Sequence, residues 1–351
     1  MIQFSSRQQK IILLLIEKGG TQSSAVHDAL TKSGENVSLV TIKRELAQLA
    51  RRGALLTTGA GRSVAYAVGV PGRIFADIDA RAYCAVEPDK RYGMKGYDFS
   101  LFSEMPPVLF SDVEQRTLED ATAEYARRTE YLPPAIQKRE LERLIIELSW
   151  KSSRIEGNTY TLLDTEKLIL ENKEAPGHDH KEAQMILNHK DAFLFIREHA
   201  KEFRTLTRAH LERLHAIVVN DLGVGTGLRG KPVGVVGSLY RPLDNLYQMQ
   251  EGIEALLKAV SQAPNPCTKA IIALLGISYL QPFEDGNKRT ARLAANAVLI
   301  AHGCAPLSYR SVEENEYREA MLVFYEINSI MPFKKIFISQ YVFAANNYAI
   351  K

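Results

Sequence analysis

The sequence predicts a mainly α-helical chain in which a small N-terminal unit precedes a larger helical domain. Capped helical segments fill the first 53 residues, and an alternating strand-like segment follows them. Prolines and glycines then interrupt the pattern, and helical signatures resume near residue 112. The chain of 351 residues, with 46% apolar and 24% charged residues, is long enough for this division. The predicted parts are a domain at 1–70, a linker at 71–111 and a domain at 112–351.

Composition limits the possible partners and the compartment. A formal charge of +3 is too small to indicate a polyanion partner, so only a local cluster of cations could do so. The 3 cysteines, Cys84, Cys267 and Cys304, form no C-x-x-C pair, which favours a reducing, cytoplasmic setting. The opening apolar run IILLLI is far shorter than the roughly 20 residues of a membrane span. We therefore expect neither a membrane span nor a signal peptide.

The first 70 residues predict three helices and a strand pair. Helices are expected in SSRQQKIILLLIEKGG, in TQSSAVHDALTKSG and in SLVTIKRELAQLARRG, where Ser38 is a cap and Gly53 a stop. The segment ALLTTGAGRSVAYAV alternates on either side of a glycine-rich turn, which is typical of a hairpin.

This order resembles a winged helix-turn-helix, in which the third helix enters the major groove of DNA and the wing contacts phosphates. The resemblance implies that Thr41, Lys43 and Arg44 contact DNA from the third helix and that Arg62 does so from the wing tip. The alternative is that these cations form a solvated face of a module that binds protein. A DNA-binding module would also fit a homodimer, because operators are commonly two-fold.

Two further segments carry weaker predictions. The linker is expected to be extended, with a short strand near residues 73–78 and no chemistry. In the helical domain, 233-VGVVGSLYRPL-243 has the β-branched residues and glycines of a short hairpin or flap. Such a hairpin would cover a ligand, or it would be a plain connecting ribbon.

The stretch 280-LQPFEDGNKRTAR-292 joins two apolar helices, 268–280 and 289–303. Unpaired backbone N–H groups at the start of the second helix form an anion site, and Lys288, Arg289 and Arg292 add positive charge. Arg289 and Arg292 lie one turn apart, and Asp285 is placed to hold Mg²⁺ on a polyphosphate. The spacing thus predicts a nucleotide site; the alternative is a helix cap formed by Asp285.

Three motifs together resemble the Fic (Fic/Doc) family. The stretch just described resembles its signature H-P-F-x-D/E-G-N-G-R-x-x-R, 228-LRGKPVGVVGSLYRP-242 resembles its target-docking hairpin, and 152-SSRIEGN-158 resembles its inhibitory motif. The resemblance covers residues 112–350 and implies a helical Fic core with a β-hairpin flap that binds ATP and transfers AMP onto a protein hydroxyl.

The resemblance also implies roles for individual residues. Mg²⁺ would be bound by Asp285, and the phosphates by Gly286, Asn287, Lys288, Arg289 and Arg292. Glu156 would pair with Arg292 and keep the resting protein inhibited, with Ser152 and Gly157 fixing that segment. The target protein would dock on the flap residues Val235, Gly237, Ser238 and Tyr240.

Two residues depart from the family pattern. Gln281 stands where the family has the histidine that accepts the proton of the attacking hydroxyl, and a carboxamide cannot hold a proton. Lys288 replaces a glycine, and in the Doc branch a lysine there accompanies phosphate transfer. Two hypotheses therefore stay open: an autoinhibited AMP or phosphoryl transferase, and a nucleotide-responsive DNA-binding regulator without turnover.

Overall fold

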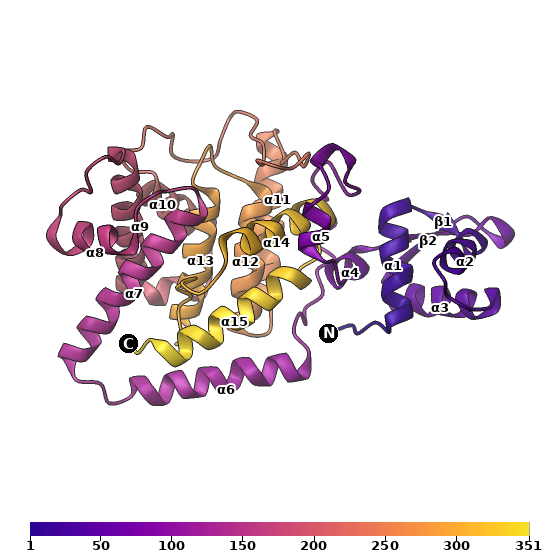
Figure 1. Cartoon of the computed structure of the whole chain (residues 1–351), viewed down its shortest axis with the longest axis horizontal. Coiled ribbons are helices and arrows are strands. Elements are labelled where there is room, and N and C mark those ends of the chain that lie inside the picture. The colour runs from indigo at the N-terminus through magenta and orange to yellow at the C-terminus, as the bar shows by residue number, and fades with distance from the viewer. Residues whose placement is uncertain (351) are drawn as a thin grey trace. The chain divides into compact units, whose positions relative to one another are not determined.

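The computed structural model describes residues 1–350, except for the side chain of Arg62. The chain divides into two compact units, each described by itself below (Figure 1). Unit 1 comprises 1–106, 234–241 and 319–333, and unit 2 comprises 107–233, 242–318 and 334–351. These units are defined by contacts within the structure. The domain boundaries 1–70, 71–111 and 112–351 therefore stay a prediction.

Unit 1 begins with three helices and a three-stranded antiparallel sheet. Its first elements are α1 (Ser6–Lys18), β1 (Thr21–Gln22), α2 (Ser23–Lys32), α3 (Leu39–Arg51), β2 (Leu55–Thr58), the 3-10 turn η1 (Gly61–Ser63) and β3 (Ala65–Val68). The strand order is β1-β3-β2, with Leu55 opposite Val68 and Thr21 opposite Tyr66. The predicted three helices and strand pair are confirmed. The capping predicted for the third helix is also correct, since Ser38 accepts from the Thr41 N–H.

The remainder of unit 1 corrects one expectation. Residues 73–78 were expected to include a strand, but the chain forms α4 (Val70–Ile74), with Pro71 in its first turn, and then an irregular segment. Proline favours this position because a first-turn residue needs no backbone N–H. The helix α5 (Ala80–Cys84) and the 3-10 turn η2 (Pro88–Lys90) follow. Val323 and Ile327 of α14 (Glu314–Ile327) pack into the same apolar core.

The expected hairpin at 233–243 is also corrected. The described backbone forms no strand pair there; it has a turn from the Ser238 N–H to the Val235 carbonyl, and an isolated bridge joins Gly96 to Arg241. The reason lies in the side chains. Ser238 donates to the Glu326 carboxylate at 2.6 Å, and Tyr240 stacks on Tyr325. These contacts fix the segment against α14 instead of against its own backbone.

Unit 2 is helical throughout, as predicted. Its elements are α6 (Asp112–Thr129), α7 (Pro134–Ile155), α8 (Leu162–Glu171), α9 (His180–Glu198), η3 (Ala200–Arg204), α10 (Arg208–Val218), α11 (Leu246–Gln262), α12 (Pro266–Leu280), α13 (Asn287–Ala301), the first turn of α14 and most of α15 (Met331–Asn347). The predicted loops near 133, 172–180 and 221–234 are confirmed. Among the described helices, none has the length and apolar character needed to cross a membrane.

The core of unit 2 is built around α12 and α13. From Cys267 to Leu280 every residue of α12 but Lys269 is buried, and on α13 only Lys288 and Ile300 are not. The two helices pack side by side, and α7, α9 and α10 contact α13 (Figure 1). The short connection from α12 to α13 is therefore anchored by two buried helices, which leave it little freedom.

Candidate functional site

The loop between α12 and α13 begins at Gln281, which ends α12. This residue adopts a left-handed backbone (φ 48°), which is unusual for a residue that carries a side chain. Its Nε2 donates to the Ser278 carbonyl at 2.7 Å, and its own carbonyl accepts from Arg229 Nε at 2.6 Å. The amide is thus engaged with backbone, and it has no group that could take up a proton.

Asn287 holds the middle of the loop. Its Oδ1 accepts from the Phe283 N–H and its Nδ2 donates to the Phe283 carbonyl, both at 2.8 Å. The Phe283 ring is buried and stacks on His215 of α10, with 3.9 Å between ring centroids and 8° between ring planes. Backbone and ring of Phe283 are therefore fixed from two sides.

Asp285 and Gly286 form the turn into α13. Gly286 is the N-cap, and the described side chains offer this helix no capping acceptor. The Asp285 carboxylate instead accepts from the Gly286 N–H at 2.6 Å, and its carbonyl contacts His215 Nε2 at 2.9 Å. The alternative that Asp285 simply caps the helix is not what the structure shows. The first-turn N–H groups remain available to an anion, which the positive end of a helix favours.

Gly286 cannot be replaced without strain. Its φ of 77° is in the left-handed region, and an added Cβ would lie 3.0 Å from Val219 Cγ1 and 3.3 Å from Val218 Cγ1. The close approach of α10 thus requires a glycine at the start of α13.

The two arginines of the motif are buried although they carry charge. The Arg289 side chain is 3% exposed and reaches the 67% exposed Asp285 carboxylate at 3.3 Å. Burial lowers the pKa of Arg289, and the carboxylates of Asp285 and Glu156 oppose that shift. Beside this pair, burial and the charges of Arg292 and Arg289 lower the pKa of His189 well below its usual range, so this histidine is neutral.

Arg292 is paired with the segment at the end of α7. Its Nη1 donates to Glu156 Oε1 at 2.9 Å, its Nε to Ser152 Oγ at 2.8 Å and its Nη2 to the Ser152 carbonyl at 2.9 Å. Burial alone would lower the pKa of Arg292, but its electrostatic interactions with Tyr317 and Glu156 outweigh burial and raise that pKa. Hydrogen bonds of this charge-assisted kind are the strong ones in proteins.

Glu156 has a second cationic partner. Lys288 Nζ lies 3.4 Å from Glu156 Oε2, and the carboxylate is 18% exposed. Burial alone would raise the pKa of Glu156, but the charges of Arg292 and Lys288 outweigh burial and lower it. Glu156 is the C-cap of α7, and Gly157 next to it has a φ of 99°, which lets the chain turn away from the helix.

The residues predicted for the nucleotide site thus come together in unit 2. Asp285, Gly286, Lys288, Arg289 and Arg292 are joined to each other or to Ser152 and Glu156 by contacts of 3.4 Å or less. Gln281 lies at the start of the same loop, where the hydrogen bonds described above join it to Ser278 and Arg229. The predicted flap residues and the predicted DNA-binding residues belong to unit 1. The side chain of Arg62 lies outside the described side chains.

Three residues that support the loop or lie near its arginines were not found from the sequence. His189, His215 and Arg229 all precede the motif along the chain. His215 occupies an ordinary position in an amphipathic helix, and Arg229 sits in a glycine-rich loop. Nothing local distinguishes either from a structural or solvated residue.

Asp285 offers a magnesium ion an exposed carboxylate here, whereas the carboxylate of Glu156 is already paired with Arg292 and Lys288. Among residues 1–350, no group of three or more histidines, cysteines or acids could hold a metal. Mg²⁺ bound to phosphates commonly uses one or two carboxylates and otherwise water and phosphate oxygens. The exposed Asp285 at the start of α13 fits that pattern and does not fit an all-protein metal site.

Comparison with known proteins matches the part of the chain that holds Gln281 to Arg292 to a known family. Residues 205–299 match the model of the Fic/DOC family. A protein adenylyltransferase Fic of Nematostella vectensis is 26% identical over 186 residues, covering 52% of this chain and 44% of the relative. One of Drosophila yakuba is 27% identical, covering 48% of this chain and 34% of the relative. The chain thus spans less than half the length of these curated relatives.

Solved structures give the same fold. Fic-1 of C. elegans (residues 134–508) has a TM-score of 0.58 at 20% identity, covering 67% of this chain and 72% of that one. A Fic family protein of Desulfovibrio desulfuricans has a TM-score of 0.56 at 21% identity, covering 69% and 75%. The predicted mainly helical, Fic-type fold is confirmed. Residues 205–299 of this chain are a Fic/DOC domain.

Proposed function

We propose that this protein binds ATP at the start of α13 and that Glu156 holds the site in an inhibited state. The uncapped first turn of α13, with Arg289 and Arg292 buried behind it, is the observation that carries the proposal. Each feature favours phosphate, because backbone N–H groups and guanidinium groups both suit its oxygens.

Each residue then has a physical task. Gly286 and Asn287 shape the turn so that the phosphates can approach backbone N–H groups. Arg289 and Arg292 would bind the distal phosphates. Asp285 would hold Mg²⁺, which supplies positive charge to the phosphate oxygens. Glu156 occupies the guanidinium of Arg292 at 2.9 Å and competes with a distal phosphate for it.

Transfer of AMP requires that a target hydroxyl attacks the α-phosphorus, pyrophosphate leaves and the hydroxyl proton is accepted. Gln281 cannot accept that proton, and general-base catalysis is typically worth about 10² to 10⁴ in rate. We therefore infer an AMP transferase-like site that is slow in the natural protein, with protein targets docking through Val235, Gly237, Ser238 and Tyr240. In unit 1 Val236 is 95% exposed, whereas Val235 and Tyr240 are buried, so a target would contact the tip of this segment at residues 236–238.

The test is incorporation of label from ATP labelled at the α-phosphate, compared with ATP labelled at the γ-phosphate. The variants are wild type, Glu156→Gly, and Glu156→Gly combined with Gln281→His. Glu171→Gly, at the end of α8, is the matched control for loss of a helix-end acid. We expect α-label only in the double variant; γ-label would indicate phosphate transfer, and no ATP binding by any variant would refute the proposal.

A DNA-binding role for residues 1–70 is supported by the exposed face of α3. Lys43, Arg44 and Arg51 are exposed there, and no ion pair of these residues is found among the described contacts. Val40, 77% exposed on the same helix, would suit the methyl group of thymine. Unpaired cations on one helix face are the feature that phosphate recognition requires.

A gel shift with upstream DNA at several salt concentrations tests this second function. We expect Lys43→Ala with Arg44→Ala to abolish the shift, because each phosphate contact contributes to the salt-dependent affinity. Arg127→Ala with Lys138→Ala removes the same charge from exposed sites in unit 2 and is expected to leave the shift unchanged. No shift at low salt would exclude the role.

A further inference from the structure

The first turn of α14 contacts the end of α7 at several points, and these contacts lie within unit 2. Arg318 donates to the carbonyl of Ile155 from both Nε (3.1 Å) and Nη2 (2.7 Å). Ile155 is the last residue of α7 and directly precedes Glu156. A guanidinium at this place satisfies an end carbonyl of the helix and opposes the negative end of the helix dipole.

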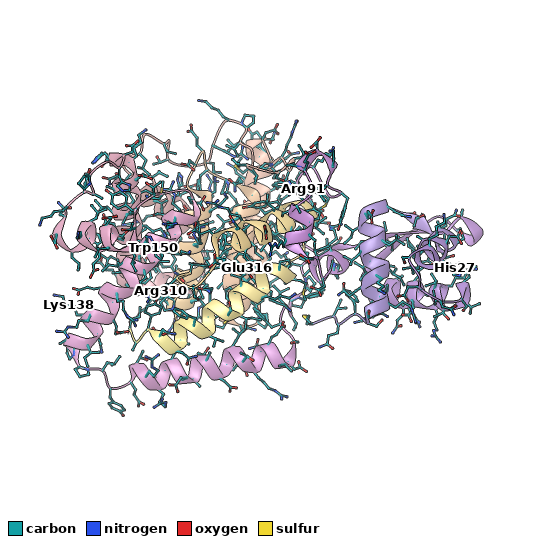
Figure 2. The ribbon with its side chains drawn as sticks, in the orientation of Figure 1. His27, Arg91, Lys138, Trp150, Arg310 and Glu316 are labelled. Carbon is teal, nitrogen blue, oxygen red and sulfur yellow. The ribbon has the colours of Figure 1, made fainter. Side chains whose placement is uncertain are left out.

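One turn earlier on α14, Glu314 contacts two cationic side chains in the last turns of α7. Its Oε1 accepts from Lys151 Nζ at 3.1 Å and from Arg154 Nε at 3.0 Å. Trp150 lies beneath both cations, with ring-to-cation distances of 5.4 and 5.9 Å, and Figure 2 shows this ring on α7. A carboxylate shared by two cations on successive turns fixes the rotation of α7 about its axis.

Between these two residues, Tyr317 approaches the other member of the inhibitory pair. Its ring lies 5.6 Å from the guanidinium carbon of Arg292. One turn of α14 therefore holds the backbone before Glu156 from one side and packs against Arg292 from the other. The side chain of Glu156 reaches Arg292 only if the end of α7 keeps its position and direction.

We propose that Arg318 and Glu314 are positioning residues that latch the inhibitory carboxylate of Glu156 onto Arg292. This rests on the proposed function, because the latch matters only if Glu156 competes with a distal phosphate. Arg318 sets the backbone from which Glu156 projects, and Glu314 sets the rotation of the helix. Loss of either frees the end of α7 while every residue of the phosphate site stays in place.

The experiment compares the affinities of ATP and AMP by calorimetry in wild type, Glu156→Gly, Arg318→Met and Glu314→Gln. Arg128→Met is the matched control, since Arg128 Nη1 also donates to a helix carbonyl, that of Ala345 at 2.9 Å. We expect ATP to bind about 5- to 150-fold more tightly in the latch variants, the usual range for coupled groups. AMP, which lacks distal phosphates, should bind as in wild type, and Arg318→Lys should restore part of the inhibition.

Hydrogen exchange of residues 152–157 without nucleotide provides a second measurement. Exchange should be faster in Arg318→Met and Glu314→Gln than in wild type or Arg128→Met. The latch is refuted if Glu156→Gly tightens ATP binding while the two latch variants behave as wild type. If Glu156→Gly does not raise the affinity for ATP relative to that for AMP, the proposed inhibition by Glu156 is itself refuted. Glu314→Gln keeps the test valid should Arg318→Met not fold.

Discussion

Arg292 and Glu156 are joined by a 2.9 Å hydrogen bond in which the cation is fully buried and the carboxylate is partly open to solvent. The other two nitrogens of the guanidinium are bound by Ser152. Among the described hydrogen-bond partners of Arg292, Glu156 is the charged one. Its side chain can move away from Arg292 without unfolding α7. Ser152 would keep the guanidinium in place for whatever anion arrives next.

Glu156→Ala is expected to lower the free energy of unfolding by about 3 kcal/mol at neutral pH, because it leaves a buried cation without an anion. Phosphate or sulfate should restore part of that stability by binding at Arg292. Thermal denaturation with and without the two anions measures both effects. The same anions should do much less for wild type, and an equal response in both proteins would contradict the assignment.

Asn287 and Asn296 offer a matched pair. Asn287 binds the N–H and carbonyl of Phe283, and Asn296 binds the N–H and carbonyl of Leu307 in the same way. Either change to alanine leaves buried backbone groups unpaired and should cost about 1–3 kcal/mol per group. Only Asn287→Ala should also weaken ATP binding, as measured by calorimetry. Equal losses of binding in both variants would mean that the loop is not the site.

Substitutions of Gly286 and Gly303 distinguish the cost of a strained backbone from the cost of steric crowding. Both have a φ above 70°, but an added Cβ meets Val219 at Gly286 and nothing within 4 Å at Gly303. Gly303→Ala should lose about 1 kcal/mol from the left-handed backbone alone. Gly286→Ala should lose more and should displace the turn that receives phosphate. Chemical denaturation gives the first comparison and ATP titration the second.

His189 makes stability depend on pH. Its pKa in the folded protein lies well below 6.5 because of burial and then the charges of Arg292 and Arg289. The unfolded chain takes up a proton near pH 6.5 while the folded one does not, so stability falls as pH drops below that value. The slope for one group is about 1.4 kcal/mol per pH unit. His189→Phe should flatten this slope between pH 6.5 and 5, as measured by chemical denaturation at several pH values.

The sequence predicted the motif well because its information is local. A helix start, a glycine turn and two arginines one turn apart are all encoded within 13 residues. Buried helices on both sides then fix the position of the loop, and Arg289 and Arg292 are buried in the core of unit 2.

What the sequence did not predict depends on distant partners. His215 stacks on Phe283 from 68 positions away, and Arg318 reaches Ile155 over 163 positions. Neither contact leaves a local pattern. The hairpin at 233–243 was wrong for the same reason, because Glu326 and Tyr325 satisfy its side chains and replace the cross-strand pairing.

The contact between Lys288 and Glu156 limits which ligands can displace Glu156 from Arg292. Lys288 holds one carboxylate oxygen and Arg292 the other, so a ligand that reaches only one cation leaves the carboxylate tethered to the other. Under the proposed function, release of Glu156 needs an anion that engages both cations together. A chain of phosphates is long enough to do so and a single small anion is not, so the site would respond to the length of a polyphosphate as well as to its charge.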